Sequence, residues 1–199
     1  MFATLNDLLV PMAAATPGSG EIFASEFFGT AILLMFGVGT CCTNNLLKSK
    51  GNGGGWLMIN FGWGLAVYMG VYAAYKTGGH LNPAVTIMKA VWHGLDSKVT
   101  LNGPSIADGG IPVTGTNVCI YIIAQLLGAM VGALIAYLAY KKHFDLQMDD
   151  PRPKLWCFST APEVRSYGWN TLTEIIGTFG LLAFCLLYTS DAADDSLRV

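Results

Sequence analysis

The residues best suited to chemistry lie between positions 78 and 86, which read Gly-Gly-His-Leu-Asn-Pro-Ala-Val-Thr. Asn82 is a strong helix N-cap and Pro83 is favoured at the first helical position, so this spacing predicts a helix over residues 82–92. Such a helix is roughly 16 Å long, about half the thickness of a bilayer's hydrocarbon core. A half-length helix after a glycine-rich segment indicates a re-entrant loop, which a membrane tolerates where the loop lines a water-filled cavity or is buried in protein.

This element offers hydrogen-bonding groups along a path. Its N-terminus places unpaired backbone N–H groups and partial positive charge near the middle of the membrane, where they disfavour cations and protons. Gly78, Gly79 and His80 can offer carbonyl oxygens as acceptors, and glycine lets a ligand approach the backbone closely. The side-chain amide of Asn82 adds donors. The segment therefore predicts donors and acceptors that line one file.

Two glutamates occupy matching positions in an internal repeat. Residues 25–30 read Ser-Glu-Phe-Phe-Gly-Thr and residues 173–178 read Thr-Glu-Ile-Ile-Gly-Thr, which places Glu26 and Glu174 148 residues apart. A carboxylate within a membrane span is costly and implies a polar partner. Internal repeats build many transporters and channels, whose site lies between the two halves. With three spans between the repeat starts, the second unit would begin inverted.

The elements that must position these groups are membrane-spanning helices. Of the 199 residues, 53% are apolar and 12% are charged, about half the charged fraction of an average soluble domain. Long windows hold at most one ionised side chain, and they predict spans at residues 22–46, 56–75, 118–140 and from about 170. The net charge of −2 argues against a nucleic-acid partner. The sequence thus predicts an all-α polytopic membrane protein.

Two of the predicted spans carry a small residue at every fourth position. Small residues at this spacing let helix backbones approach closely in lipid, so both spans are expected to pack tightly in a bundle. The two stripes are Gly62, Ala66, Gly70 and Ala74 in one span, and Ala124, Gly128, Gly132 and Ala136 in the other.

Residues 78–86 resemble the first signature of the aquaporin, or major intrinsic protein, family. Residues 61–67 (Phe-Gly-Trp-Gly-Leu-Ala-Val), residues 124–129 (Ala-Gln-Leu-Leu-Gly-Ala) and both repeat starts also look like family segments. The resemblance covers about residues 21–95 and 118–187. It implies an aquaporin-like right-handed helical bundle, with a first repeat of three spans and a re-entrant half-helix at residues 21–140. A connecting loop at residues 141–169 and the first span of a second repeat at residues 170–187 would follow.

Within the family, the glycerol uptake facilitator branch looks nearest, because Trp63 resembles the tryptophan that this branch places at the outer constriction. The resemblance implies a passive channel for glycerol and other small neutral solutes. In it, Glu26 and Glu174 would be buried carboxylates that support the re-entrant loops and are not catalytic acids, and Gln125 would be another buried support. The expected pore residues are Gly78, Gly79, His80, Asn82, Pro83, Ala84 and Trp63. No cofactor or metal is expected, since the remaining histidines have no partners at metal-ligand spacing.

Three other functions stay open on the sequence. The first is a water-selective channel, and the second is a truncated fragment without function. The third is an intramembrane enzyme that uses Glu26, Glu174 and His80, but no nucleophile–base spacing supports it, so the chain is not expected to be an enzyme. The expected partners are the lipid bilayer, glycerol and water, and the resemblance implies a homotetramer in the plasma membrane.

Several features depart from the family pattern or concern the ends of the chain. Residues 1–20 are expected to form a leader, and residues 188–199, with three aspartates in five positions, a non-native tail. The second Asn-Pro-Ala and the arginine of the outer filter are expected beyond residue 199. About 20 additional residues at 97–116 are expected to form a solvated loop. The family orientation places residues 89–117 in the cytoplasm, whereas the distribution of lysine and arginine favours the opposite orientation.

Overall fold

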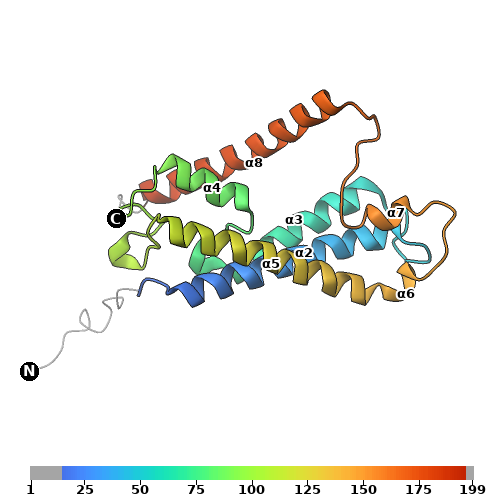
Figure 1. Cartoon of the computed structure of the whole chain (residues 1–199), viewed down its shortest axis with the longest axis horizontal. Helices are drawn as coiled ribbons and strands as arrows, with labels where there is room; N and C mark the ends of the chain where they lie inside the picture. Colours follow the sequence, from blue (N-terminus) through green and yellow to red (C-terminus); the bar gives the residue numbers. More distant parts are fainter. Residues whose placement is uncertain (1–14, 196–199) are drawn as a thin grey trace, which may run out of the picture.

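The computed structural model describes residues 15–195, which form helices and the segments that connect them (Figure 1). Within that range the one pairing outside the helices that resembles a strand is an isolated antiparallel bridge between Thr100 and Pro112. The long helices are α2 (Ser19–Asn45), α3 (Gly55–Ala73), α5 (Gly115–Ala139) and α8 (Tyr167–Asp195), and the shorter ones are η1 (Tyr75–Thr77), α4 (Pro83–Trp92), η2 (Ile106–Asp108), α6 (Lys141–Phe144) and α7 (Arg152–Leu155).

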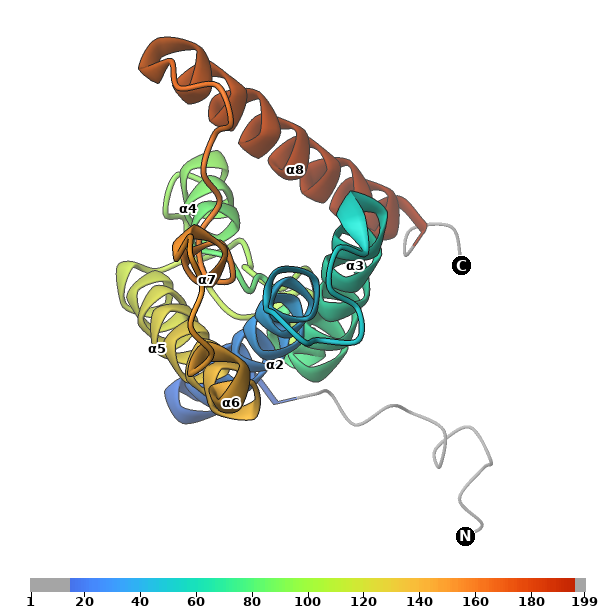
Figure 2. The ribbon, with the colours of Figure 1, turned by 90° about the vertical axis from the view of Figure 1, so that its right-hand side faces the viewer.

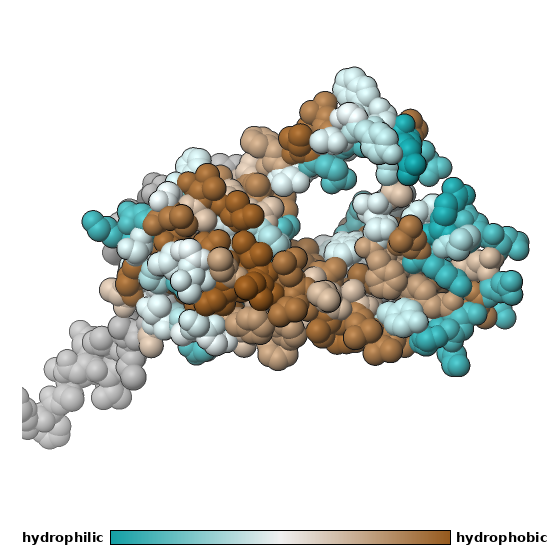
Figure 3. All heavy atoms as spheres, in the orientation of Figure 1, coloured by the Kyte–Doolittle hydropathy of each residue, from teal (hydrophilic) through white to brown (hydrophobic). Residues whose placement is uncertain are grey.

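Four of these helices are long and apolar enough to cross a membrane, which confirms the all-α membrane fold. Their bounds lie within a few residues of the predicted spans, and in α8 the stretch that qualifies is Tyr167–Leu186. Large apolar side chains such as Phe61 on α3 and Met130 on α5 are about two-thirds exposed. In Figure 3 apolar residues cover the middle of the visible face, while hydrophilic residues gather at the end that carries α6 and α7. An apolar middle with hydrophilic residues at one end is the distribution expected of a helical bundle in a bilayer.

Helix α2 packs between α3 and α5, and both stripes of small residues face it. A Cβ atom added at Gly128 would lie 2.3 Å from the Phe27 carbonyl oxygen, and one at Gly132 would lie 2.3 Å from that of Ala31. On α3, a Cβ atom at Gly70 would lie 2.8 Å from the Gly29 carbonyl oxygen. The predicted close packing is therefore confirmed, with backbone set directly against backbone.

Replacing Gly128 with leucine is expected to destabilise the fold by about 1–3 kcal/mol or more, because the new side chain meets the α2 backbone and cannot simply rotate away. The measurement is thermal unfolding of the purified protein in detergent. Gly180→Leu is the matched control, since an added Cβ atom at this α8 position meets nothing within 4 Å. Equal melting temperatures for the two variants would contradict the assigned packing.

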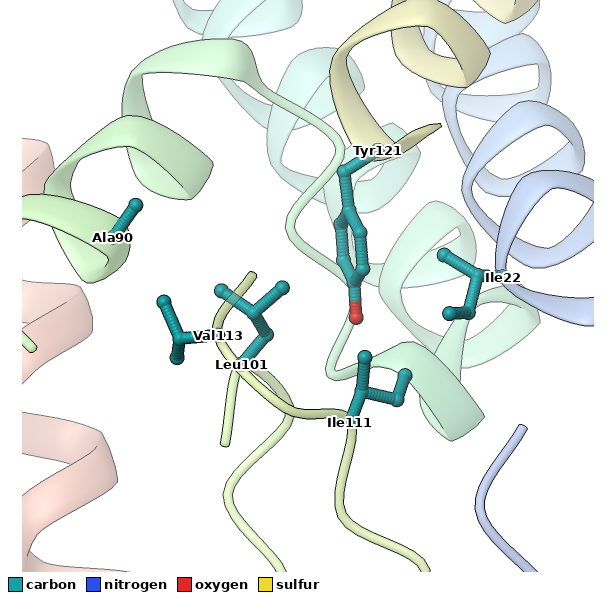
Figure 4. Close-up of a cluster of buried hydrophobic side chains, with 6 residues drawn as sticks. All are labelled: Ile22, Ala90, Leu101, Ile111, Val113 and Tyr121. Carbon is teal, nitrogen blue, oxygen red and sulfur yellow. The ribbon is translucent and has the colours of Figure 1, made fainter. Parts of the chain in front are cut away.

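Residues 97–114 form a folded lobe, so the expectation of a solvated loop is wrong. The Leu101 N–H donates to the Ile111 carbonyl at 2.8 Å, and the Val113 N–H donates to the Val99 carbonyl at 2.9 Å. Apolar residues alternate on both sides of this pairing, a pattern typical of extended segments with one buried face. Figure 4 shows the resulting cluster, in which Leu101, Ile111 and Val113, all fully buried, lie with Ile22, Ala90 and Tyr121.

The connection from α5 to α8, predicted as a loop at residues 141–169, contains the short helices α6 and α7. Arg152 begins α7, and its Nε donates to both carboxylate oxygens of Asp150, at 3.0 and 2.8 Å. This side-chain pairing holds the pKa of the Asp150 carboxyl below its ordinary value. The charged turn lies at the hydrophilic end of the bundle.

Helix α8 lies to one side of the bundle and approaches it near α4 (Figures 1 and 2). None of its spanning stretch is buried by the rest of the described chain. The helix continues through Asp195, across most of the segment interpreted as a non-native tail, whose origin stays a prediction. At the other end, residues 1–14 of the expected leader lie outside the described residues, and α2 already begins at Ser19.

Candidate functional site

The re-entrant segment turns sharply between η1 and α4. Gly78, Gly79 and Leu81 all have positive φ angles, of 80°, 58° and 53°. A Cβ atom at Gly79 would lie 3.0 Å from Val71 Cα, so only glycine lets this backbone lie against α3 in that conformation. The turn brings the chain into the bundle and starts α4 there.

Asn82 caps α4 as the sequence predicts. Its Oδ1 accepts from the Ala84 N–H at 2.9 Å, and Pro83 occupies the first helical position. Because the cap uses the oxygen, the amide orientation is fixed and the Nδ2 group faces away from the helix N-terminus. Within residues 15–195 this NH₂ group makes no hydrogen bond, so Asn82 keeps two free donors.

Three successive carbonyl oxygens precede this cap. In the described part of the chain, no N–H or O–H group donates to the carbonyls of Gly78, Gly79 or His80. The Thr77 carbonyl just before them is occupied, since Tyr121 Oη donates to it at 2.8 Å. The segment therefore offers three free acceptors followed by the free amide of Asn82.

The carboxylate of Glu26 holds this segment from the α2 side. Oε1 accepts from Thr77 Oγ1 at 2.7 Å and from the His80 N–H at 3.1 Å. Oε2 accepts from the Leu81 N–H at 2.9 Å and from Gln125 Nε2 at 2.8 Å. The side chain is fully buried, and all four contacts are donors, which suits the ionised carboxylate.

Gln125 and His80 extend this network to α4. Gln125 Nε2 also donates to Thr86 Oγ1 at 3.0 Å, and Thr86 Oγ1 lies 3.0 Å from His80 Nδ1. His80 Nε2 lies 3.0 Å from the Leu101 carbonyl oxygen. A carbonyl only accepts, so Nε2 carries a proton, and the neutral ring then accepts at Nδ1 from the Thr86 hydroxyl. The His80 ring is thus fixed on both sides.

Trp63 lies in a different place, on the wall of a cavity of about 610 Å³. Its indole N–H donates to Cys41 Sγ at 3.3 Å, and its ring fills the space beside Gly37. The cavity is lined in part by Trp56, Trp156 and Phe158, and by none of residues 78–84. Trp63 precedes Val71, the α3 contact of Gly79, by eight residues or roughly 12 Å along the helix. The structure thus separates Trp63 from the other expected pore residues.

Glu174 requires a correction. It was expected to be a buried carboxylate, but the structure leaves it exposed on α8, with no hydrogen bond or ion pair to any residue in the range 15–195. The physical reason is that no element of the described chain packs on that part of α8. Whether Glu174 supports a second re-entrant loop stays a prediction.

Sequence reasoning missed several residues that complete the network. Thr77, Thr86 and Tyr121 each bind a group named above, and Lys89, only 6% exposed, donates from Nζ to the Leu101 carbonyl at 2.9 Å. One signal was available, because Lys89 is a cation in an otherwise apolar half-helix and such a group needs a polar partner. The partner itself is a backbone carbonyl twelve residues away, which the sequence alone does not predict.

The chain resembles known membrane proteins along nearly its whole length. The model of the family described as major intrinsic protein matches residues 15–101 and 109–197, on either side of a gap within the 97–114 lobe. No solved structure matches the chain.

Several curated relatives carry the name glycerol uptake facilitator protein, with or without a qualifier, and three of them are described here. A probable one from Thermotoga maritima is 44% identical over 179 residues, which is 89% of this chain and 68% of the relative. One from Bacillus subtilis is 41% identical and covers 80% of this chain and 52% of the relative. Glycerol uptake facilitator protein 3 of Lactiplantibacillus plantarum is 38% identical, and the match covers 80% of this chain and 60% of the relative. The chain thus spans between about half and two-thirds of these relatives.

Proposed function

Because this chain belongs to the major intrinsic protein family, we propose that it forms the first half of a passive transmembrane channel for glycerol and other small neutral solutes. It is a channel segment and not an enzyme. The observation that carries the proposal is the run of free acceptors at Gly78, Gly79 and His80, followed by the free Asn82 amide at the start of α4. A solute hydroxyl both donates and accepts, so it can exchange its water partners for these groups.

Charge in the same place supports neutral solutes over ions. The N-terminus of α4 carries the positive end of its backbone dipole, and Pro83 and Ala84 bring no side-chain charge to it. The carboxylate that binds this segment, Glu26, is fully occupied by four donors. A cation that reached this point would meet like partial charge and no free carboxylate.

The complete path is proposed to need the second repeat. In that arrangement Trp63, on the wall of its cavity, contributes an aromatic face to an outer constriction, and Glu174 supports the second re-entrant loop. We further propose a homotetramer with one path per subunit, inserted in the plasma membrane. Glu26 and Gln125 act as supports of the first loop.

The test is the swelling of proteoliposomes in iso-osmotic glycerol, measured by stopped-flow light scattering with sorbitol as the control solute. A chain that carries both repeats is expected to pass glycerol much faster than sorbitol, and the 199-residue chain alone is expected to pass neither. Water flux without glycerol flux would show a water-selective channel instead. Chemical turnover of a solute without its passage would overturn the channel assignment.

Removing the aromatic face of Trp63 is expected to lower glycerol flux relative to water flux. Trp63→Ala in the chain with both repeats should reduce this ratio by roughly two- to tenfold, the effect of losing one aromatic contact with the polyol carbon chain. Trp56→Ala is the matched control, since Trp56 lines the same cavity but is 72% exposed. Unchanged flux ratios in Trp63→Ala would remove Trp63 from the path.

A further inference from the structure

The 97–114 lobe contacts the re-entrant segment on both sides of its free carbonyls. On the near side, Asn102 Nδ2 donates to the Lys76 carbonyl at 3.0 Å, and a Cβ atom at Gly78 would lie 3.0 Å from Asn102 Cα. On the far side, the Leu101 carbonyl accepts from His80 Nε2 and from Lys89 Nζ, at 3.0 and 2.9 Å. Two adjacent lobe residues therefore hold the segment from residue 76 to residue 89.

The lobe is rigid where it makes these contacts. The Leu101 N–H donates to the Ile111 carbonyl, and Asn102 Oδ1 accepts from the Ile111 N–H at 2.7 Å. Leu101 and Ile111 are both fully buried, beneath α4 and beside Tyr121 (Figure 4). A carbonyl fixed in this way can set the position of the groups that donate to it.

Lys89 is the unusual member of this contact. A buried ammonium loses its hydration, and that loss is large unless the charge is paired or hydrogen-bonded. Within residues 15–195, Lys89 Nζ makes a single hydrogen bond, and its acceptor is the same carbonyl that His80 uses. Hydrogen bonds from a charged donor are about twice as strong as neutral ones, so Lys89 contributes more than His80 to holding the Leu101 carbonyl in place.

The contact continues to the far wall of the bundle. From the Leu101 carbonyl, hydrogen bonds run through the His80 ring, the Thr86 hydroxyl and the Gln125 amide to the Glu26 carboxylate. The His80 backbone N–H is bound at the other end of this chain, by Glu26. The orientation of the His80 peptide group therefore depends on both Glu26 and the lobe.

We propose that the 97–114 lobe positions the three free carbonyl groups of residues 78–80, and that Lys89 is the positioning residue that holds the lobe's Leu101 carbonyl against His80. The proposal rests on the proposed function, since it assigns the lobe to the same solute path. The family model matches residues 15–101 and 109–197, so Lys89 and Leu101 lie in matched stretches, whereas Asn102 lies in the gap between them. The positioning of these carbonyls by the lobe is expected to affect glycerol flux more than water flux, because a polyol binds several acceptors at once.

The first test uses the 199-residue chain in lipid and does not depend on conduction. Solid-state ¹⁵N NMR is expected to show the His80 ring protonated at Nε2 and unprotonated at Nδ1. In Lys89→Met a second set of His80 signals with the proton on Nδ1 is expected, because the Leu101 carbonyl has lost its hydrogen bond from Lys89 Nζ. Lys89→Arg should restore the wild-type spectrum, since a guanidinium also donates. Lys98→Met is the matched control, because Lys98 is an exposed lysine of the same lobe.

The second test measures flux in a chain that carries both repeats. Lys89→Met is expected to lower the glycerol-to-water permeability ratio about threefold, the size expected for weakening one neutral hydrogen bond, while Lys98→Met leaves the ratio unchanged. Asn102→Ala acts on the other side of the segment and should shift the ratio in the same direction, which keeps the test decisive if Lys89→Met does not fold.

The two measurements separate the proposals. A wild-type channel that passes no glycerol contradicts the proposed function, while the His80 spectra still decide whether the lobe positions the segment. Wild-type spectra and an unchanged ratio in both Lys89→Met and Asn102→Ala would overturn the positioning role. An equal effect of Lys98→Met would also overturn it, since a general charge effect would then explain the result.

Discussion

Replacing Glu26 with leucine is expected to prevent the re-entrant segment from folding. The substitution removes the acceptor of four buried donors, from Thr77, His80, Leu81 and Gln125. The Thr77 hydroxyl can donate to the Ala74 carbonyl at 3.0 Å instead, so three donors are left without a partner. Each buried donor of this kind costs about 1–3 kcal/mol, and together the three costs approach the whole stability of a typical domain. The measurement is the yield of monodisperse protein in detergent, followed by its thermal unfolding.

The internal repeat supplies the control for this experiment. Glu174→Leu changes the equivalent glutamate, which is exposed in this chain, and is expected to alter stability by less than about 0.5 kcal/mol. Glu26→Gln keeps one acceptor oxygen and should fall between the two. Wild-type behaviour of Glu26→Leu would mean that the four hydrogen bonds do not hold the segment.

Replacing Asn82 with alanine is expected to reduce glycerol flux about tenfold in a chain that carries both repeats. The substitution removes the free Nδ2 donor, and one hydrogen bond of about 1.4 kcal/mol in the path corresponds to a tenfold change in rate. It also removes the helix cap, which costs about 1 kcal/mol of stability. The measurement is glycerol flux by stopped-flow, normalised to the amount of inserted protein.

Asn82→Asp separates these two losses. Aspartate keeps the oxygen that caps Ala84 but has no NH₂ group, and it adds a negative charge at the N-terminus of α4. Stability near that of the wild type is therefore expected together with low glycerol flux. Glycerol flux equal to that of the wild type in both variants, at equal insertion, would exclude Asn82 as a donor to the solute.

The structure confirms the sequence predictions that depend on local interactions. The four spans follow from apolar windows, and the α4 start follows from the adjacent Asn82 and Pro83. The stripes of small residues were also predicted to pack closely, although the sequence did not show that both would face α2. These features need only neighbouring residues, or a single face of one helix, to be recognised.

The structure corrects the predictions that required knowledge of distant neighbours. The sequence predicts a solvated loop at residues 97–116 because they are additional to the family pattern, and the alternation of Val99, Leu101, Ile111 and Val113 is not part of that prediction. The apolar face of this lobe is buried by α2, α4 and α5, which the local pattern does not name. Likewise Glu174 matches Glu26 in sequence and differs from it in burial, since packing and not residue type decides burial.

By itself the sequence determined the membrane class, the helix positions, the capped half-helix and the family, because hydropathy, capping and motif spacing are written in consecutive residues. Only the tertiary structure decided that Glu26 binds four donors and that Lys89 and His80 share the Leu101 carbonyl. These contacts join positions as far as 99 residues apart, as in the bond between Gln125 and Glu26. A backbone carbonyl is present at every position, so which one becomes an acceptor is decided by how the chain packs.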